Sequence, residues 1–146
     1  VENYLESNTR FLLVNNNWRG LVFDGSRENI ESIKSQEFYW RNDLTAKNAW
    51  IDRDNINDLI KSEGFDGEVG ILSVDIDGND YWVWESIEVV NPIIVIVEWN
   101  DDAPFGPNHD YRISKEELKL IVKDKGFILE KEFSAGPSHH GLVFSL

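Results

Sequence analysis

The 146-residue chain contains no cysteine, which excludes a disulfide framework, a thiolate nucleophile and a cysteine-based zinc site. It also contains no methionine, not even at position 1, which indicates a translation start upstream of Val1 or an engineered sequence. No apolar run approaches the roughly 20 residues that span a bilayer, and no signal peptide is evident. We therefore expect a cytoplasmic protein with no membrane partner.

Basic residues are also scarce, with 14 Lys and Arg against 27 Asp and Glu, for a net charge of −13. Binding of long polyanions needs a basic surface, so we expect no nucleic-acid partner. One nucleotide-like ligand in a local pocket stays compatible with this charge, and so does a simple solvated acidic surface. Hydrophobic residues make up 41% of the chain, enough for one core in a single domain over residues 1–146.

Short apolar runs alternate with amphipathic stretches, which is typical of an α/β fold with a parallel sheet. Strands are predicted at residues 20–24, 38–40, 71–75 and 92–98, with an antiparallel edge pair at 127–133 and 141–146. Helices are predicted at residues 7–15, 26–35, 54–64, 81–87 and 114–126, several of them with a capping residue. Gly64 and Gly126 each follow a helix, where left-handed backbone favours glycine.

Acidic residues end the clearest apolar runs. In the segment GILSVDIDGND (residues 70–80), Asp75 and Asp77 follow a run that predicts a strand buried on both faces. Asp24 ends an earlier run in the same way. Open α/β sheets bind ligands at the carboxyl ends of their strands, and an acid there accepts hydrogen bonds from ribose hydroxyls. The alternative for Asp24 is a turn or helix-cap role, because Gly25-Ser26 follows.

The same residues allow a metal hypothesis. Asp75, Asp77 and Asn79 offer oxygen ligands to a hard cation, but the sixth and twelfth positions lack the glycine and glutamate of a calcium loop. A Mg²⁺ site formed by Asp75, Glu98 and Asn100 is an alternative, as is a substrate-binding role for Asp75.

Two adjacent histidines, His139 and His140, lie near the end of the chain. A histidine can act as a general base near neutral pH or bind a metal. Neighbours in a strand point to opposite faces, so we expect only one of the two to reach a site.

Aromatic residues gather after the acidic segment, at Tyr81, Trp82 and Trp84. They could stack on a flat ligand, but core packing is the favoured interpretation. The same interpretation is applied to Trp40 and Trp50.

Three segments carry a family resemblance: ESNTR (residues 6–10), WRGLVFDGS (18–26) and LSVDIDGNDYWVW (72–84). Over about residues 1–100 the chain resembles FkbM-type enzymes among the class I S-adenosylmethionine-dependent methyltransferases. The remainder, including GPSHHGLVF at residues 136–144, looks more like another branch of small class I methyltransferases. The chain is therefore interpreted as a combination of segments from two related proteins, produced by design or by natural divergence.

The resemblance implies a Rossmann-like three-layer α/β sandwich, mostly parallel, with an antiparallel C-terminal edge strand. It implies S-adenosylmethionine as cofactor and methyl transfer to an oxygen or nitrogen of a small-molecule substrate such as a sugar. The implied cofactor-binding residues are Glu2, Asn3, Asp24, Gly25, Ala46, Asn48 and Asp75. The implied catalytic residues are Asp75, His139 and His140, one of them as general base.

One departure from the family pattern concerns the first strand and its glycine-rich cofactor loop, which are absent from this sequence. That strand would lie between the second and fourth strands, whose edges would otherwise be exposed. Upstream residues, another segment or a second copy of the chain in a homo-oligomer would then fill the slot. The rival interpretation is a non-enzymatic scaffold that is truncated, chimeric or designed.

Overall fold

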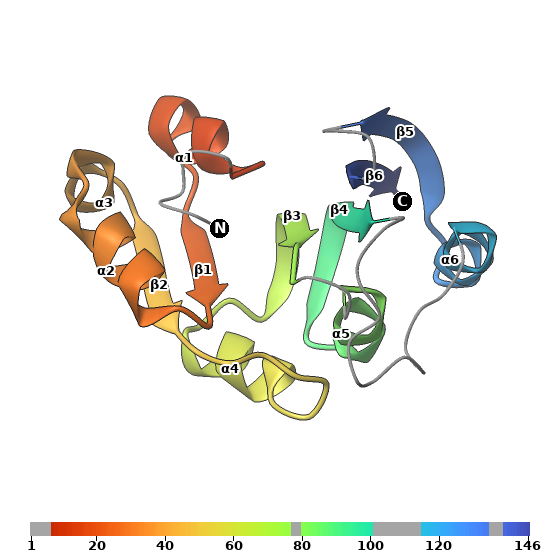
Figure 1. Ribbon diagram of the computed structural model, residues 1–146, viewed down its shortest axis with the longest axis horizontal. Coiled ribbons are helices and arrows are strands. Elements are labelled where there is room, and N and C mark those ends of the chain that lie inside the picture. The colour runs from red at the N-terminus through yellow and green to blue at the C-terminus, as the bar shows by residue number, and fades with distance from the viewer. Residues whose placement is uncertain (1–6, 77–79, 101–114, 135–138) are drawn as a thin grey trace. The chain divides into compact units, whose positions relative to one another are not determined.

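The computed structural model describes residues 7–76, 80–100, 115–134 and 139–146 (Figure 1). The chain divides into two compact units, unit 1 at Val1–Phe65 and unit 2 at Asp66–Leu146. Both units contain helices and strands, which confirms the predicted mixed α/β class.

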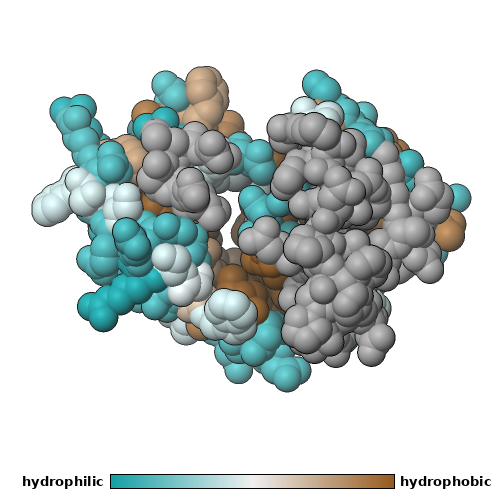
Figure 2. All heavy atoms as spheres, in the orientation of Figure 1, coloured by the Kyte–Doolittle hydropathy of each residue, from teal (hydrophilic) through white to brown (hydrophobic). Residues whose placement is uncertain are grey.

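Unit 1 contains a two-stranded parallel sheet, in which β1 (Gly20–Asp24) pairs with β2 (Leu44–Asn48). Its helices are α1 (Arg10–Asn16), α2 (Arg27–Ser35), α3 (Glu37–Arg41) and α4 (Ile56–Ser62). The core is formed by Leu13, Ile30, Ile33, Phe38, Leu44 and Ala46. Much of the visible surface of this unit is hydrophilic (Figure 2), in keeping with a chain rich in acidic residues.

Local sequence explains why α2 begins and faces the core as it does. The Ser26 hydroxyl accepts a hydrogen bond from the Asn29 backbone N–H at 3.3 Å, which caps the first turn. Ile30 and Ile33 lie three residues apart, on one helical face, and both are fully buried. The helix predicted at residues 26–35 is thereby confirmed.

The strand predicted at residues 38–40 is wrong, because α3 occupies this segment. Within the helix, Phe38 packs into the core, Trp40 is 79% exposed, and Glu37 pairs with Arg41 at 3.1 Å. The strand lies just beyond, in β2, which the sequence analysis did not assign as a strand. Tertiary packing of Phe38 outweighed the β-propensity of three aromatic or large residues.

Unit 2 contains a four-stranded sheet in the order β3-β4-β6-β5 (Figure 1). The strands are β3 (Gly67–Val74), β4 (Val90–Asn100), β5 (Ile128–Ser134) and β6 (His139–Ser145). β3 and β4 are parallel, whereas β6 runs antiparallel to both β4 and β5. The predicted antiparallel edge pair is confirmed. The predicted mostly parallel arrangement is not confirmed, because the described strand pairs include as many antiparallel as parallel ones.

The core of unit 2 lies on one face of this sheet. Alternate residues of neighbouring strands meet there, as in the register pairs Leu72 with Val95 and Val74 with Val97. Two helices, α5 (Asp80–Ser86) and α6 (Lys115–Asp124), add Trp84, Leu118 and Val122 to the same cluster. Among the described residues, unit 2 therefore has two layers, and the predicted third layer is not established.

Among the described residues, β1 and β3 each lie at an edge of their own sheet, and β2 and β5 lie at the opposite edges. The segment at residues 11–14 forms part of α1 and supplies no strand to either edge. In the part of the chain that the structure describes, no helix is long and apolar enough to cross a membrane. The predicted glycine junctions are confirmed, since Gly64 and Gly126 have φ of 68° and 85°.

We expect Leu142→Ala to lower the free energy of unfolding by roughly 2–5 kcal/mol, because Leu142 is fully buried and truncation leaves a cavity. Leu120→Ala is the matched control: Leu120 is 64% exposed on α6, so its effect should stay within about 0.5 kcal/mol. Urea unfolding followed by tryptophan fluorescence measures both. Equal losses in the two variants would contradict the assignment of the core.

Candidate functional site

Asp24 is the last residue of β1, and its carboxylate is held in place by the loop that follows. Oδ1 accepts a hydrogen bond from the Ser26 backbone N–H at 2.7 Å, and Oδ2 accepts one from Asn29 Nδ2 at 3.1 Å. Partial burial acts to raise the pKa of Asp24 and the hydrogen bonds from Ser26 and Asn29 act to lower it, and the pKa lies below its usual value. The group is therefore an oriented carboxylate that is ionised at neutral pH.

Asn48 ties the ends of β1 and β2 together. It lies opposite Asp24 in the parallel register, and its Nδ2 donates to the carbonyl oxygens of Asp24 and Gly25, both at 2.9 Å. The Ala49 N–H also donates to the Asp24 carbonyl at 3.1 Å. These hydrogen bonds hold the carboxyl ends of the two strands together.

An exposed tryptophan lies beside that edge. The Trp50 ring packs directly on Gly25, where an added Cβ would lie only 3.0 Å from Trp50 Cε3. Trp50 is nevertheless 81% exposed, so most of its flat surface faces solvent. The core role predicted for Trp50 and Trp40 is wrong, since Trp50 is exposed beside Gly25 and Trp40 is 79% exposed on α3.

Three further predicted cofactor residues have different surroundings. The Ala46 side chain is buried in the core of unit 1, 2% exposed, so only its backbone could reach a ligand. Glu2 and Asn3 lie outside the described residues. Asn29 is a partner of Asp24 that was not predicted, although its place as a polar residue in the first turn after Ser26 was the available signal.

In unit 2, Asp75 directly follows β3 and is exposed. Its carboxylate has no hydrogen-bond or ion-pair partner among the residues that the structure describes. The adjoining turn is fixed instead by the buried Asp80, whose Oδ1 accepts a hydrogen bond from the Ile76 N–H at 2.8 Å. Asp77 and Asn79 lie outside the described residues.

Strand register brings the other predicted residues of unit 2 to the same edge of the sheet. Val74 pairs with Val97, so Asp75 and Glu98 are the next residues on neighbouring strands. Across the antiparallel ladder, Asn100 pairs with His139 and Trp99 with His140. This is a placement of backbone positions, since the side chains of Asn100, His139 and His140 lie outside the described part of the structure.

The aromatic cluster after Asp75 is structural, as expected. Tyr81 and Trp84 are buried in the core, at 6% and 3% exposure, and Trp82 packs against them. For metals, no group of three or more histidine or acidic side chains suited to an ion occurs within the described ranges. The Mg²⁺ hypothesis for Asp75, Glu98 and Asn100 stays a prediction.

No protein-family model matches the chain, and no curated protein matches it. A solved structure from Sulfolobus solfataricus, provisionally assigned as a type 11 methyltransferase, is similar in fold with a TM-score of 0.48 and 18% sequence identity. The similarity covers 87% of this chain and 70% of the other. A likeness of this degree does not define the activity.

We expect Asp24→Asn to reduce stability in a pH-dependent way. Because the folded-state pKa is lowered, Asp24 contributes stability above its unfolded-state pKa, and that contribution is lost as the pH falls through the folded-state value. The variant should be less stable than the parent by on the order of 1 kcal/mol at pH 7. The difference in the free energy of unfolding between the parent and the variant should decrease steadily below about pH 4.

Urea unfolding of both proteins at several pH values between 7 and 3 measures this gap. The exposed Asp58, changed to asparagine, is the control for removal of a charge from unit 1. A gap that stays constant over the whole pH range would contradict the charge-dependent role.

Proposed function

We propose that the chain transfers a methyl group from S-adenosylmethionine to an oxygen or nitrogen of a small molecule, such as a sugar. The observation that carries the proposal is the oriented, ionised Asp24 carboxylate at the carboxyl end of a parallel strand. Ligands of open α/β sheets bind at this end of the strands, and an acid there suits a ribose. Asp75, which directly follows β3, is a second acid at the carboxyl end of a strand, in unit 2.

The residues of unit 1 fit the nucleoside end of this cofactor. The two ribose hydroxyls are donors, and a carboxylate offers about four acceptor positions on its two oxygens. The bonds from Ser26 and Asn29 fix the Asp24 carboxylate before a ligand arrives, which limits the entropy that binding would cost. The exposed Trp50 ring, brought close by Gly25, offers a flat surface for an adenine.

In unit 2, Asp75 is proposed to bind the substrate. An exposed carboxylate can bind an ammonium group or accept a proton from an acceptor hydroxyl. His139 and His140 are the alternative bases, because their strand begins at the same edge of the sheet. The cofactor supplies an electrophilic methyl group, so the chain's main task is to align the acceptor and hold its proton.

The rival proposal is a non-enzymatic α/β scaffold. It is supported by β1 and β3, each an edge strand among the described residues. In that case Asp24 would serve only to anchor the turn before α2, and no adenosyl ligand would bind.

Calorimetric titration with S-adenosylhomocysteine tests the proposal. We expect saturable binding to the parent protein and a loss of roughly tenfold or more in affinity for Asp24→Ala, since two hydrogen bonds to a charged group disappear. Asp58→Ala, at an exposed position on α4, should bind like the parent. Melting temperatures of all three proteins show whether the fold is kept.

Two results would count against the proposal. No binding by folded parent protein would support the scaffold. A loss of affinity in Asp24→Ala that is matched by an equal loss of fold would remove the ribose role, because the carboxylate would then act only on structure.

A further inference from the structure

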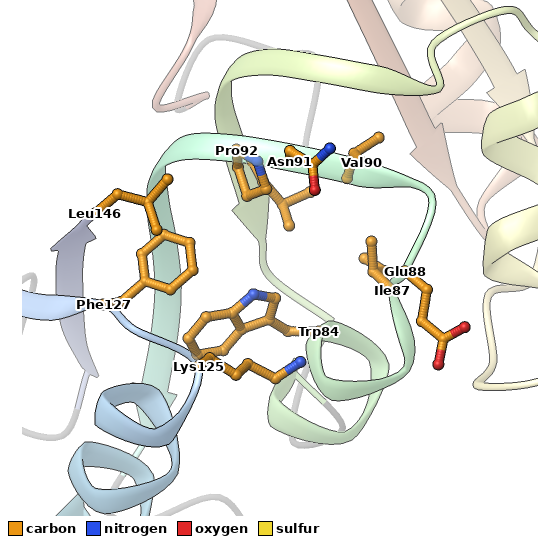
Figure 3. A pocket seen from close by; sticks show the side chains of 10 residues that line it. Trp84, Ile87, Glu88, Val90, Asn91, Pro92, Lys125, Phe127 and Leu146 are labelled. Atoms are coloured by element: carbon orange, nitrogen blue, oxygen red, sulfur yellow. The ribbon is translucent and has the colours of Figure 1, made fainter.

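A hollow beside the start of β4 is formed by core residues of unit 2 (Figure 3). Trp84 and Phe127 line it, but they are only 3% and 8% exposed and pack against each other edge to face. Lys125 and Glu88, which have opposite charges, both lie on the lining. Neither the rings nor the charges of this hollow select a ligand. The edge of β1 in unit 1 is a clearer place for a partner, because backbone groups there have none among the described residues.

The bonds at the two ends of β1 show which of its residues face β2. At the start of the strand, the Gly20 N–H donates to the Asp43 carbonyl oxygen at 2.8 Å. At its end, the Asp24 carbonyl oxygen accepts from the Ala49 N–H at 3.1 Å. Asp43 and Ala49 directly flank β2, and the register between them is continuous. The even-numbered residues of β1 therefore point their backbone groups toward β2.

Two residues of β1 point their backbone groups the other way. Because successive residues of a strand alternate, the N–H and C=O groups of Leu21 and Phe23 point away from β2. Both residues are half-buried, and no described residue bonds these groups. Backbone groups that are removed from water nearly always have a partner. The open edge of β1 therefore favours pairing with a further strand.

The other strands at sheet edges carry charge within the strand, whereas β1 does not. β5 contains the charged run EKE at residues 130–132, which is exposed, β2 contains Lys47, and β3 contains Glu68. Charged side chains on an edge strand oppose pairing with another chain. In β1 only the last residue, Asp24, is charged. The edge of β1 therefore lacks the protection that the other edges have.

The sequence of β1 is complementary to itself in an antiparallel arrangement. With a twofold axis at Val22, Leu21 of each copy lies opposite Phe23 of the other, and each of these two pairs exchanges two hydrogen bonds. The Leu21 and Phe23 side chains then meet on one face of the ladder. The two Val22 side chains meet on the other face, so both faces gain apolar cross-strand pairs.

Charge permits this contact between two strongly acidic chains. In the same register Asp24 lies opposite Gly20, which has no side chain, and not opposite the second Asp24. The two Asp24 residues are four positions apart along the ladder, which is about 13 Å at roughly 3.3 Å per residue. Physiological salt screens repulsion between exposed charges beyond about 8 Å. The net charge of −13 therefore opposes the contact only weakly at this strand.

We propose that unit 1 pairs with a second copy of the chain through β1, antiparallel about Val22. The two-stranded sheets of both copies then form one four-stranded sheet in the order β2-β1-β1-β2. A sheet of only two strands is marginally stable, and further strands add hydrogen bonds and apolar contact. The contact between two short strands is smaller than an obligate interface, so the dimer should have a dissociation constant in the micromolar range.

This inference does not rest on methyl transfer. Pairing uses the backbone of Leu21 and Phe23, whereas the cofactor proposal uses the Asp24 carboxylate, which keeps its bonds from Ser26 and Asn29. Titration with S-adenosylhomocysteine tests the cofactor site, and the mass of the particle in solution tests the strand edge. Either proposal can therefore fail while the other holds.

Sedimentation velocity from about 1 µM to about 300 µM tests the dimer, since the range spans micromolar dissociation constants. The mass of the parent should rise from 16.9 kDa toward twice that value. Leu21→Pro removes the outward N–H of each copy without touching the bonds to β2. Leu21→Ala loses the same side chain but keeps the N–H. The proline variant should therefore dimerise at least about tenfold more weakly than the alanine variant.

The absence of cysteine from the chain allows a second test that does not use the Leu21 variants. In the proposed register the two Val22 residues form a non-hydrogen-bonded pair with Cα atoms about 4.5 Å apart, within the roughly 4.4–6.8 Å of disulfides. Val22→Cys should therefore give a disulfide-linked dimer under mild oxidation. Asp58→Cys, on α4, is the control and should stay monomeric although its position is more exposed. Non-reducing electrophoresis measures both.

Three results would overturn the proposal. One is a parent protein that stays monomeric up to the highest concentration. Another is equal weakening of the dimer by folded Leu21→Pro and folded Leu21→Ala. The third is cross-linking of Asp58→Cys as fast as that of Val22→Cys. Circular dichroism checks the fold of each variant, and the cysteine variants decide the question if Leu21→Pro fails to fold.

Discussion

The pairing of β4 with β3 on one side and β6 on the other is the constraint on which unit 2 depends. Val95 and Val97 of β4 are fully buried, and their register partners on both sides belong to the same core cluster. A slip of one residue would turn these valines to the opposite face, so the register is strongly specified. That register places Asp75, Glu98 and the start of β6 at one edge of the sheet.

In unit 1, the carboxyl ends of only two strands, β1 and β2, are held in place. Its parallel pair is short, and the ends are held by Asn48, whose side chain bridges two carbonyl groups of the turn after β1. The Asp24 carboxylate is oriented by the same turn that starts α2. Structural capping and ligand binding therefore compete as explanations for one residue, and only binding experiments on a folded variant can separate them.

The sequence was informative wherever a pattern involved many apolar positions. The continuous apolar run in β4 and the caps around α2 predicted those elements, because an apolar run and a first-turn hydrogen bond each leave a strong local signal. The expected burial on both faces of such strands is wrong, since alternate residues of β4, Val95 and Val97, are fully buried and Ile93 is 59% exposed. β2 was missed because its exposed positions are polar and its buried ones, Leu44 and Ala46, are few. The exposure of Trp50 could not be predicted, since it depends on packing against Gly25. Parallel pairing alone was enough to predict that Asp75 lies beside Glu98. It was not enough to predict what His139 and His140 do chemically.

The proposed cofactor site is the carboxyl end of β1, where Asp24 would bind the ribose of an adenosyl ligand. The most direct measurement is a set of ¹H–¹⁵N NMR spectra of the labelled protein during addition of S-adenosylhomocysteine. If Asp24 binds the ribose, the backbone amides of Gly25, Ser26 and Asn48 will show saturable shifts. An absence of such shifts in the folded protein would contradict this role of Asp24.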